Sequence, residues 1–259
     1  MRKIIFFQPH PDDLELKCAR LIHHLALNCS HKFEIKIAAI TKGEFGLPGY
    51  IYDKFKGNFL GKIRTKELLK AMNLHNIKEE QIYFFGYWDG CVKFNYEFIG
   101  SILKYLEKEK PDIIFAPEAY YTSYYHADHV NTGKAIYYIL HKKMLSKRPK
   151  LFFYSTLSPN RYFGFNKEDL SLVDDLLQCH KTQFWLLNKA KILYNITIRL
   201  AALHVRGYRY AEKYRRVYFS YDTLQKNKIS YLVKMLSHWF ASWPWFKAKY
   251  PLGFSHETS

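Results

Sequence analysis

Two short clusters of titratable side chains stand out in this sequence of 259 residues. The first is Pro9-His10-Pro11-Asp12-Asp13, where an imidazole and two carboxylates lie on a turn that the prolines stiffen. The second is His126-Ala127-Asp128-His129, whose histidines would lie near one face of a first helical turn, with Asp128 as the expected cap. Two imidazoles and one carboxylate would leave the fourth position of a zinc ion open to water, as catalytic zinc sites do.

The two clusters contain enough groups for both metal binding and proton transfer. His10 and Asp13 offer one ligand pair and His129 a third ligand, which leaves Asp12 and His126 as acid and base. Spacing alone does not decide which aspartate binds the metal. Aspartate-rich turns also cap helices, and a chain with 12 histidines brings some together by chance. Because each cluster follows its own predicted strand, we interpret them as one site.

The elements that must position these residues follow from hydrophobic periodicity. Apolar runs bounded by turn formers predict buried strands at Lys3–Phe7, Phe33–Thr41, Gln81–Gly86, Asp112–Pro117 and Leu151–Ser155, and helical spacing predicts helices around 14–25, 98–106 and 130–140. Alternating strands and helices predict an α/β fold, a Rossmann-like and mainly parallel sheet flanked by helices. Ligands of such sheets lie beyond the carboxyl ends of the strands, where both clusters are expected.

The rest of the chain gives weaker signals. The glycine-rich stretch Lys42–Lys62 is expected to be a long loop that borders the site. A helix is predicted after Asp169, with two further strands at Lys191–Thr197 and Val217–Tyr221. Since no linker separates two folding units, we predict one domain over residues 1–221, followed by a basic, tryptophan-rich helical extension over residues 222–259.

Several motifs resemble those of a known family, the LmbE-like or PIG-L-like zinc N-deacetylases, which remove acetyl groups from N-acetylglucosamine units. The opening signature is His10-Pro11-Asp12-Asp13-Leu14-Glu15-Leu16 and the second is His126-x-Asp128-His129. Further matches, in the family's order, are Thr41-x-Gly43-Glu44-x-Gly46, Arg64-x-x-Glu67, Gly86-Tyr87-x-Asp89-Gly90, His180-x-x-Gln183 and Ala211-Glu212. The resemblance extends from about Lys3 to Phe219, although Lys17, Ala19 and Arg20 stand where many members carry glycines.

The resemblance implies a role for each matched residue. His10, Asp13 and His129 would bind zinc or another divalent metal, Asp12 would act as general base, and His126 would steady the oxyanion or protonate the leaving amine. The positions of Arg64, Asp89 and Glu44 imply contacts with the substrate. The implied reaction is hydrolysis of an N-acetylglucosamine-type sugar, free, phospho-linked or lipid-linked, to acetate and a free amine.

The charge and the C-terminal residues of the chain indicate which partners it could bind. Forty Lys and Arg residues against 23 Asp and Glu give a net charge of +17, which favours anionic partners, including a phosphate-bearing sugar conjugate. Residues 201–259 hold ten basic and three acidic groups, and Ile229, Leu232, Val233, Leu236, Trp239 and Phe240 share one helical face. This face predicts peripheral membrane contact; packing on the domain or on a second copy is the alternative, so a homo-oligomer stays open.

The sequence also predicts where the protein is located and leaves two rival functions open. Four widely spaced cysteines, an initial apolar run that stops at Gln8 and the lack of a spanning segment predict a cytoplasmic protein. One rival function is a zinc hydrolase that acts on a different amide or ester. Another is a basic nucleic-acid-binding or membrane-binding protein with a vestigial metal site. Nucleic acid is disfavoured because most aromatic residues lie in apolar core patterns and no recognition motif occurs.

Overall fold

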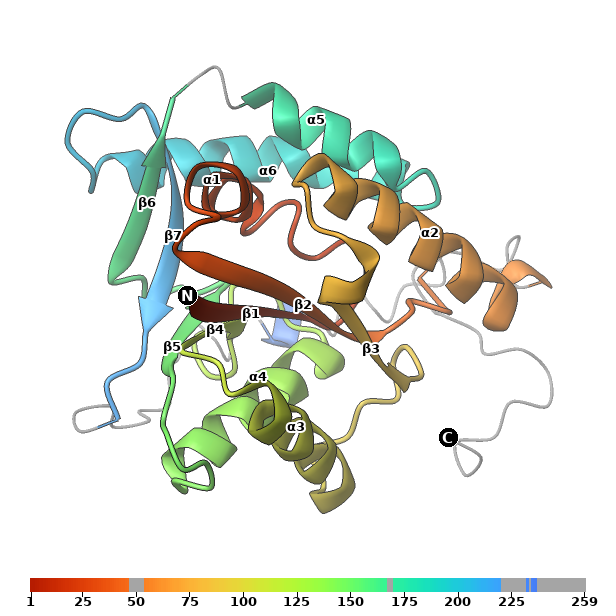
Figure 1. Ribbon diagram of the computed structural model, residues 1–259. Helices are drawn as coiled ribbons and strands as arrows, with labels where there is room; N and C mark the ends of the chain where they lie inside the picture. Colours follow the sequence, from red (N-terminus) through yellow and green to blue (C-terminus); the bar gives the residue numbers. More distant parts are fainter. Residues whose placement is uncertain (47–53, 167–169, 220–231, 233, 237–259) are drawn as a thin grey trace.

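The computed structural model describes residues 1–46, 54–166, 170–219, 232 and 234–236, and its centre is a seven-stranded sheet (Figure 1). The strand order is β3-β2-β1-β4-β5-β7-β6. The strands are β1 (Arg2–Gln8), β2 (Phe33–Thr41), β3 (Ile82–Tyr87), β4 (Ile113–Pro117), β5 (Lys150–Tyr154), β6 (Arg161–Phe165) and β7 (Tyr210–Arg216). Strands β1 to β5 pair in parallel, whereas β7 runs antiparallel to both β5 and β6.

Helices cover both faces of this sheet (Figure 1). They are α1 (Ala19–Asn28), α2 (Asn58–Leu74), α3 (Tyr96–Glu109), α4 (Ala127–His141), α5 (Leu170–Cys179) and α6 (Phe184–Ala202), with a short 3-10 helix, η2 (Glu79–Gln81). On β1, Ile4 and Phe6 pack under the layer of α1, α2, α5 and α6, while Ile5 and Phe7 pack under α3 and α4. The uninterrupted apolar run arises because both faces of β1 are buried. The predicted α/β class and the five parallel strands are confirmed.

The C-terminal third differs from the prediction. Residues 191–197, predicted as a strand, lie inside α6, and the strand expected at 217–221 is replaced by β7, which ends at Arg216. Strand β6 was not predicted. Most of the predicted extension, including its amphipathic helix, lies outside the described residues. Among the described residues, no helix combines the length and apolar character needed to cross a bilayer.

The loops before α1 and α2 also end at unexpected positions. Helix α1 begins at Ala19 rather than near Leu14, because residues 11–18 form successive turns. The predicted glycine-rich loop ends earlier than Lys62, since α2 already begins at Asn58. Both helices therefore start directly behind the loops that carry the predicted site, and Glu67 and Arg64 of α2 are buried.

The junction between α5 and α6 is tied to these loops by buried polar contacts. His180 Nε2 lies 2.7 Å from Glu15 Oε1, and both side chains are fully buried. Burial disfavours a charged His180, but the Glu15 carboxylate outweighs it, so the pKa of His180 is raised. Thr182 donates from its backbone N–H and its hydroxyl to Glu67. The motif residues Glu15, Glu67 and His180 thus hold the helical layer against the site loops.

Helix α1 is capped by a residue from the far end of the domain. Its N-cap residue, Cys18, makes no side-chain cap hydrogen bond. Instead the backbone N–H groups of Arg20 and Leu21 donate to the carboxylate of Glu212 on β7, at 2.9 and 3.1 Å. The Tyr214 hydroxyl donates to the same carboxylate at 2.6 Å. An acceptor at a helix N-terminus satisfies the orphan backbone donors there. Burial raises the pKa of Glu212 to about 7, so its charge complements the helix dipole only in the ionised fraction.

We therefore expect Glu212→Ala to lower the free energy of unfolding by about 3 kcal/mol, because three donors lose a buried acceptor. Glu212→Gln keeps one acceptor oxygen and should lose less. Urea unfolding followed by circular dichroism measures both. Glu107→Ala, at an exposed position of α3, is the control and should change stability by less than about 0.5 kcal/mol. Equal stability of Glu212→Ala and the control would contradict the capping role.

Candidate functional site

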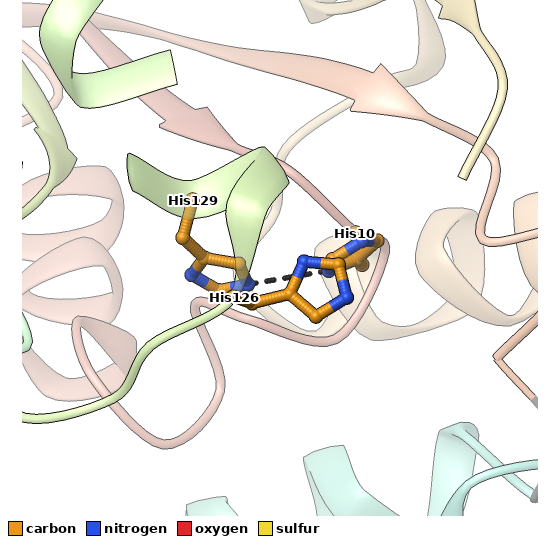
Figure 2. Close-up of side chains that lie close together, drawn as sticks. All are labelled: His10, His126 and His129. Atoms are coloured by element: carbon orange, nitrogen blue, oxygen red, sulfur yellow. Dashed lines mark hydrogen bonds between the residues drawn. The ribbon is translucent and has the colours of Figure 1, made fainter. Parts of the chain in front are cut away.

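The carboxyl edge of the sheet brings the two sequence clusters together. His10 follows β1, and the second cluster opens α4, beyond the end of β4. The imidazoles of His10, His126 and His129 are neighbours, with ring centroids 4.8 Å apart for His10 and His126 and 5.2 Å apart for His10 and His129 (Figure 2). Asp128 was expected to cap α4, but the N-cap residue is His126. The Nδ1 atom of His126 accepts a hydrogen bond from the Asp128 backbone N–H at 3.3 Å.

Three of the converging side chains have donor atoms spaced like metal ligands. His10 Nδ1 lies 3.2 Å from His129 Nε2, the contact drawn as a dashed line in Figure 2. The Asp13 carboxylate places one oxygen 3.5 Å from His10 Nδ1 and the other 3.1 Å from His129 Nε2. Ligands bound tetrahedrally at about 2.0–2.1 Å stand about 3.3 Å from each other. The donor set of His10, Asp13 and His129 therefore fits zinc.

The second nitrogen of His10 is held by carboxylates. His10 Nε2 lies 3.0 Å from Asp89 Oδ1 and 3.3 Å from Asp128 Oδ2. A histidine that donates its Nε2–H to a carboxylate has its lone pair on Nδ1, which faces Asp13 and His129; metal-binding histidines are commonly oriented in this way. Two other sets of three donors also cluster here, His10 with His126 and His129, and His10 with Asp89 and Asp128. Asp89 and Asp128 face the Nε2 atom of His10, which carries the proton in this arrangement, so the set of His10, Asp89 and Asp128 is not suited to bind a metal.

The charges of the site also fit a cation. Burial disfavours a charged His10, but the carboxylates around it, first Asp89, outweigh burial and raise its pKa well above the ordinary value. Burial would raise the pKa of Asp13, yet His129 and His10 hold it well below its usual range. Buried carboxylates thus outnumber the fixed positive charges and draw a proton onto His10. A divalent cation bound by the same donors would compensate the same excess of negative charge.

Asp12 is not part of this donor set, although it is adjacent to Asp13 in the sequence. Its Oδ1 accepts a hydrogen bond from a terminal nitrogen of Arg64 at 2.8 Å, and the other terminal nitrogen donates to the Gly43 carbonyl at 2.9 Å. The Arg64 side chain is 2% exposed and that of Asp12 12%. The guanidinium is therefore fixed at both ends and holds the Asp12 carboxylate in one orientation at the edge of the site.

The substrate contacts expected of Arg64, Asp89 and Glu44 stay a prediction, and the structure shows what these side chains contact within the protein. All three side chains are buried and occupied within the protein. Besides its contact with His10, Asp89 accepts a hydrogen bond from the backbone N–H of Phe45. Glu44 accepts from the backbone N–H of Asp89 at 3.2 Å, and burial raises its pKa. Asp89 thus contacts His10 directly, Glu44 supports the Asp89 loop, and Arg64 contacts Asp12 and Gly43.

Two residues of the site were not predicted from the sequence to take part in its chemistry. Asp128 is fully buried, and its carboxylate accepts from the backbone N–H groups of Gly90 and Val92 while it contacts His10. Its place in the second motif was the available signal, but it suggested only a cap. Tyr124 is 48% exposed, and its ring centroid lies 5.1 Å from that of His129. A lone tyrosine in a tyrosine-rich chain carries no local signal for such a place.

Comparison with solved structures supports the fold. The N,N'-diacetylchitobiose deacetylase of Pyrococcus horikoshii is similar with a TM-score of 0.73 and 22% identity, covering 88% of each chain. A conserved protein of Thermus thermophilus gives a TM-score of 0.67 and 21% identity, covering 86% of this chain and all of that one. GalB of Pseudomonas putida, a 4-carboxy-2-hydroxymuconate hydratase, gives 0.61 and 13%, covering 88% of this chain and 99% of that one.

At such identities these likenesses establish the architecture alone, and they include both a deacetylase and a hydratase. Comparison with curated proteins gives no significant match. A family model provides the closer assignment, because it matches residues 5–140, which contain both the first cluster after β1 and the second at the start of α4. That model is described as PIG-L, GlcNAc-PI de-N-acetylase, and the match over more than half of the chain shows that the protein belongs to the PIG-L family.

Proposed function

We propose that the protein is a metal-dependent N-deacetylase, which hydrolyses the acetamide of an N-acetylglucosamine-type sugar to acetate and a free amine. The observation that carries the proposal is the donor set of His10, Asp13 and His129, together with the adjacent residue Asp12, whose carboxylate is bound by a buried arginine and not used as a donor. The family's description as a GlcNAc-PI de-N-acetylase supports the bond and the sugar. The likeness to a diacetylchitobiose deacetylase agrees with it.

His10, Asp13 and His129 would hold the metal, for which we propose zinc; another divalent ion would suit the same donors less specifically. The chemistry that such an ion supplies when bound is Lewis acidity, which polarises the acetyl carbonyl and lowers the pKa of water toward 7. Asp89 and Asp128 keep the Nε2–H of His10 engaged, so that Nδ1 presents its lone pair.

Asp12 would accept the proton of the attacking water. Asp12 lies in the same loop as His10 and directly precedes the proposed ligand Asp13 in the sequence. Arg64 fixes one oxygen by a hydrogen bond of 2.8 Å, which leaves the other oxygen to act as the acceptor. A positioned general base of this kind typically contributes 10²- to 10⁴-fold to the rate.

His126 would stabilise the oxyanion that develops on the acetyl oxygen. Its Nδ1 accepts from the Asp128 backbone N–H, so the proton of the neutral ring lies on Nε2. Burial, and then the charge of His10, lower the pKa of His126 to about 4. Near pH 7 the ring is therefore a neutral donor through Nε2–H, and it favours the oxyanion role over direct protonation of the leaving amine.

The contact between Arg64 and Asp12 gives a testable consequence for Gly46. A Cβ atom built at Gly46 would lie 2.0 Å from a terminal nitrogen of Arg64, so Gly46→Ala must displace the guanidinium. We expect kcat/KM for acetate release to fall by about 10- to 100-fold, because a small misplacement of a catalytic group is costly. Gly100→Ala in α3, where a Cβ meets nothing within 4 Å, is the matched control. Full activity of Gly46→Ala would remove Arg64 from the mechanism.

The aglycone is the open part of the proposal. The net charge of +17 supports an anionic, phosphate-bearing sugar conjugate, and four free cysteines support a reducing, cytoplasmic setting. The proposed peripheral membrane contact depends on the tail, which lies mostly outside the described residues. A different amide or an ester remains the alternative substrate, because the metal ligands do not select the bond.

A substrate panel tests the function. Free, nucleotide-linked, inositol-linked and lipid-linked N-acetylglucosamine are incubated with the zinc-loaded protein, and acetate is measured with and without a chelator. We expect chelator-sensitive acetate release from at least one of them, and none from the Asp12→Ala variant. If the zinc-loaded protein releases acetate from none of these sugars but hydrolyses a simple ester or another amide, the N-acetyl sugar assignment is wrong.

A further inference from the structure

Helix α6 carries apolar side chains on two opposite faces. Leu187, Tyr194 and Ile198 are 7%, 5% and 3% exposed and pack in the helical layer of Figure 1. The opposite face of a surface helix is normally polar. In α6 and its C-cap residue that face is aliphatic instead: Leu186 is 40% exposed, Ile192 67%, Leu193 65%, Ile196 51%, Leu200 57% and Leu203 81%. We call these six residues the α6 strip.

The spacing of the α6 strip is that of a helix-packing seam. Five of its residues, together with Lys189, follow one another at steps of three, four, three, four and three: Leu186, Lys189, Leu193, Ile196, Leu200 and Leu203. Such alternation keeps side chains in line with a facing helix. Single exposed apolar residues are ordinary on protein surfaces, but a continuous row of them indicates a contact site.

We infer that the α6 strip is the docking surface for a second copy of this chain, with the two α6 helices packed antiparallel about a two-fold axis near Ile196. Lys189 decides the direction, since it is the one charged residue in the seam. In an antiparallel pair, Lys189 lies opposite Leu203 of the second copy, because each is seven positions from Ile196. The two Lys189 side chains are then about 21 Å apart along the axis, well beyond the screening length of physiological salt.

A parallel pair would instead place the two Lys189 ammonium groups face to face. The antiparallel arrangement also closes on itself, since a two-fold contact uses the same surface on both copies and leaves no strip uncovered. Helix α6 has no acidic residue that could pair with a cation of the second copy's α6, so the aliphatic side chains must supply the contact between the two helices.

The size of the strip is adequate for a dimer. At about 30 Å² of apolar surface for each methylene-sized group, the six partly exposed aliphatic side chains would remove roughly 900 Å² from water in a two-fold pair. With the Lys189 stem, the contact comes to about 1,000 Å², the lower end of the range expected of a specific interface.

An anionic lipid surface fits the strip less well. Helices that lie in a membrane interface carry their cations on the polar side. Lys189 instead stands within the apolar row, between Leu186 and Leu193. A facing helix of finite length lets this side chain reach solvent past the Leu203 end.

Sedimentation velocity of the full chain at about 5 and 50 µM tests the inference. We expect a dimer or a multiple of it for the unaltered protein, and a monomer for Ile196→Glu combined with Leu200→Glu. Leu27→Glu, at a 45% exposed position of α1, is the matched control and should sediment like the unaltered protein. Circular dichroism confirms that each variant is folded. A monomeric unaltered protein at 50 µM, or equal sedimentation of the double variant, overturns the inference.

Crosslinking tests the antiparallel register separately. With a short bismaleimide, Ile196→Cys should yield a crosslinked dimer, whereas Leu203→Cys alone should not, and a mixture of Lys189→Cys and Leu203→Cys chains should. The unaltered protein supplies the background from its own cysteines, of which Cys29 and Cys91 are half-buried. Crosslinking of Lys189→Cys with itself would overturn the register. Flotation with anionic vesicles that the double glutamate variant loses, in a monomeric protein, would assign the strip to lipid instead.

Discussion

Alanine at position 12 is expected to slow acetate release by about a thousandfold while the protein keeps its metal. The reason is geometric: Asp12 accepts its hydrogen bond from Arg64 and contributes no atom to the set formed by His10, Asp13 and His129. Loss of a general base costs 10²- to 10⁴-fold in rate. The fall should appear in kcat rather than in KM, because the proton is transferred only during the reaction.

Metal content, measured by elemental analysis after dialysis, distinguishes the loss of a general base from the loss of the metal site. Asp12→Asn preserves the shape and a hydrogen-bond acceptor for Arg64, so it should retain the fold and lose the same activity. Asp13→Ala is the contrast, since it should lose metal and activity together. If Asp12→Ala turns over substrate within about tenfold of the unaltered protein, another group accepts the proton. If it loses the metal, Asp12 is a ligand and the roles of the two aspartates must be exchanged.

Local sequence patterns predicted the part of the fold that depends on burial alone. The run Ile4–Phe7 is apolar at every position because helices cover both faces of β1, and this marks a central parallel strand. The position of the site followed from the same pattern, since His10 and His129 stand just beyond the ends of neighbouring strands β1 and β4. Their approach to 3.2 Å agrees with that expectation.

The unpredicted elements are those whose burial depends on distant partners. Strand β7 contains Glu212 and Arg215, which read as surface residues in a local window. Arg215 is buried because it forms two hydrogen bonds, of 2.8 and 2.9 Å, to Glu118, 97 positions away. In α6, Ile192 and Ile196 suggested a strand because that helix is apolar on its outer side as well. The partner of Arg215 is not visible in the sequence around β7, and the outer apolar side chains of α6 hide the helical period there.

The inward orientation of Asp89 and Glu44 was unpredictable for a related reason. Their carboxylates accept backbone N–H groups of Phe45 and of Asp89 itself, and these directions are set by how two loops pack against each other. A motif gives the identity and order of such residues, but it does not say whether a side chain faces the substrate or the ligand behind it. A second-layer carboxylate and a substrate-binding carboxylate therefore look alike in sequence.

His129→Ala should abolish both metal binding and acetate release, because it removes one of three donors whose mutual distances match a zinc site. Stoichiometric zinc should fall to near zero after dialysis, and activity should fall by at least about a thousandfold, since water without a bound metal is a far weaker acid. Asp89→Asn should instead retain metal with about 10- to 100-fold weaker affinity, because it touches only the outer nitrogen of His10. Zinc titration by calorimetry measures both.

His126→Ala distinguishes the two groupings of three donors that contain His129. Its Nδ1 is occupied by the Asp128 backbone N–H, and we place Nε2 beside the oxyanion rather than on the metal. The variant should therefore bind zinc as tightly as the unaltered protein and lose about a hundredfold in kcat. Loss of zinc from His126→Ala, with zinc retained in Asp13→Ala, would shift the ligand set to the three histidines. In that case Asp13 rather than His126 would be free to act on the substrate, and the roles proposed for these two residues would have to be exchanged.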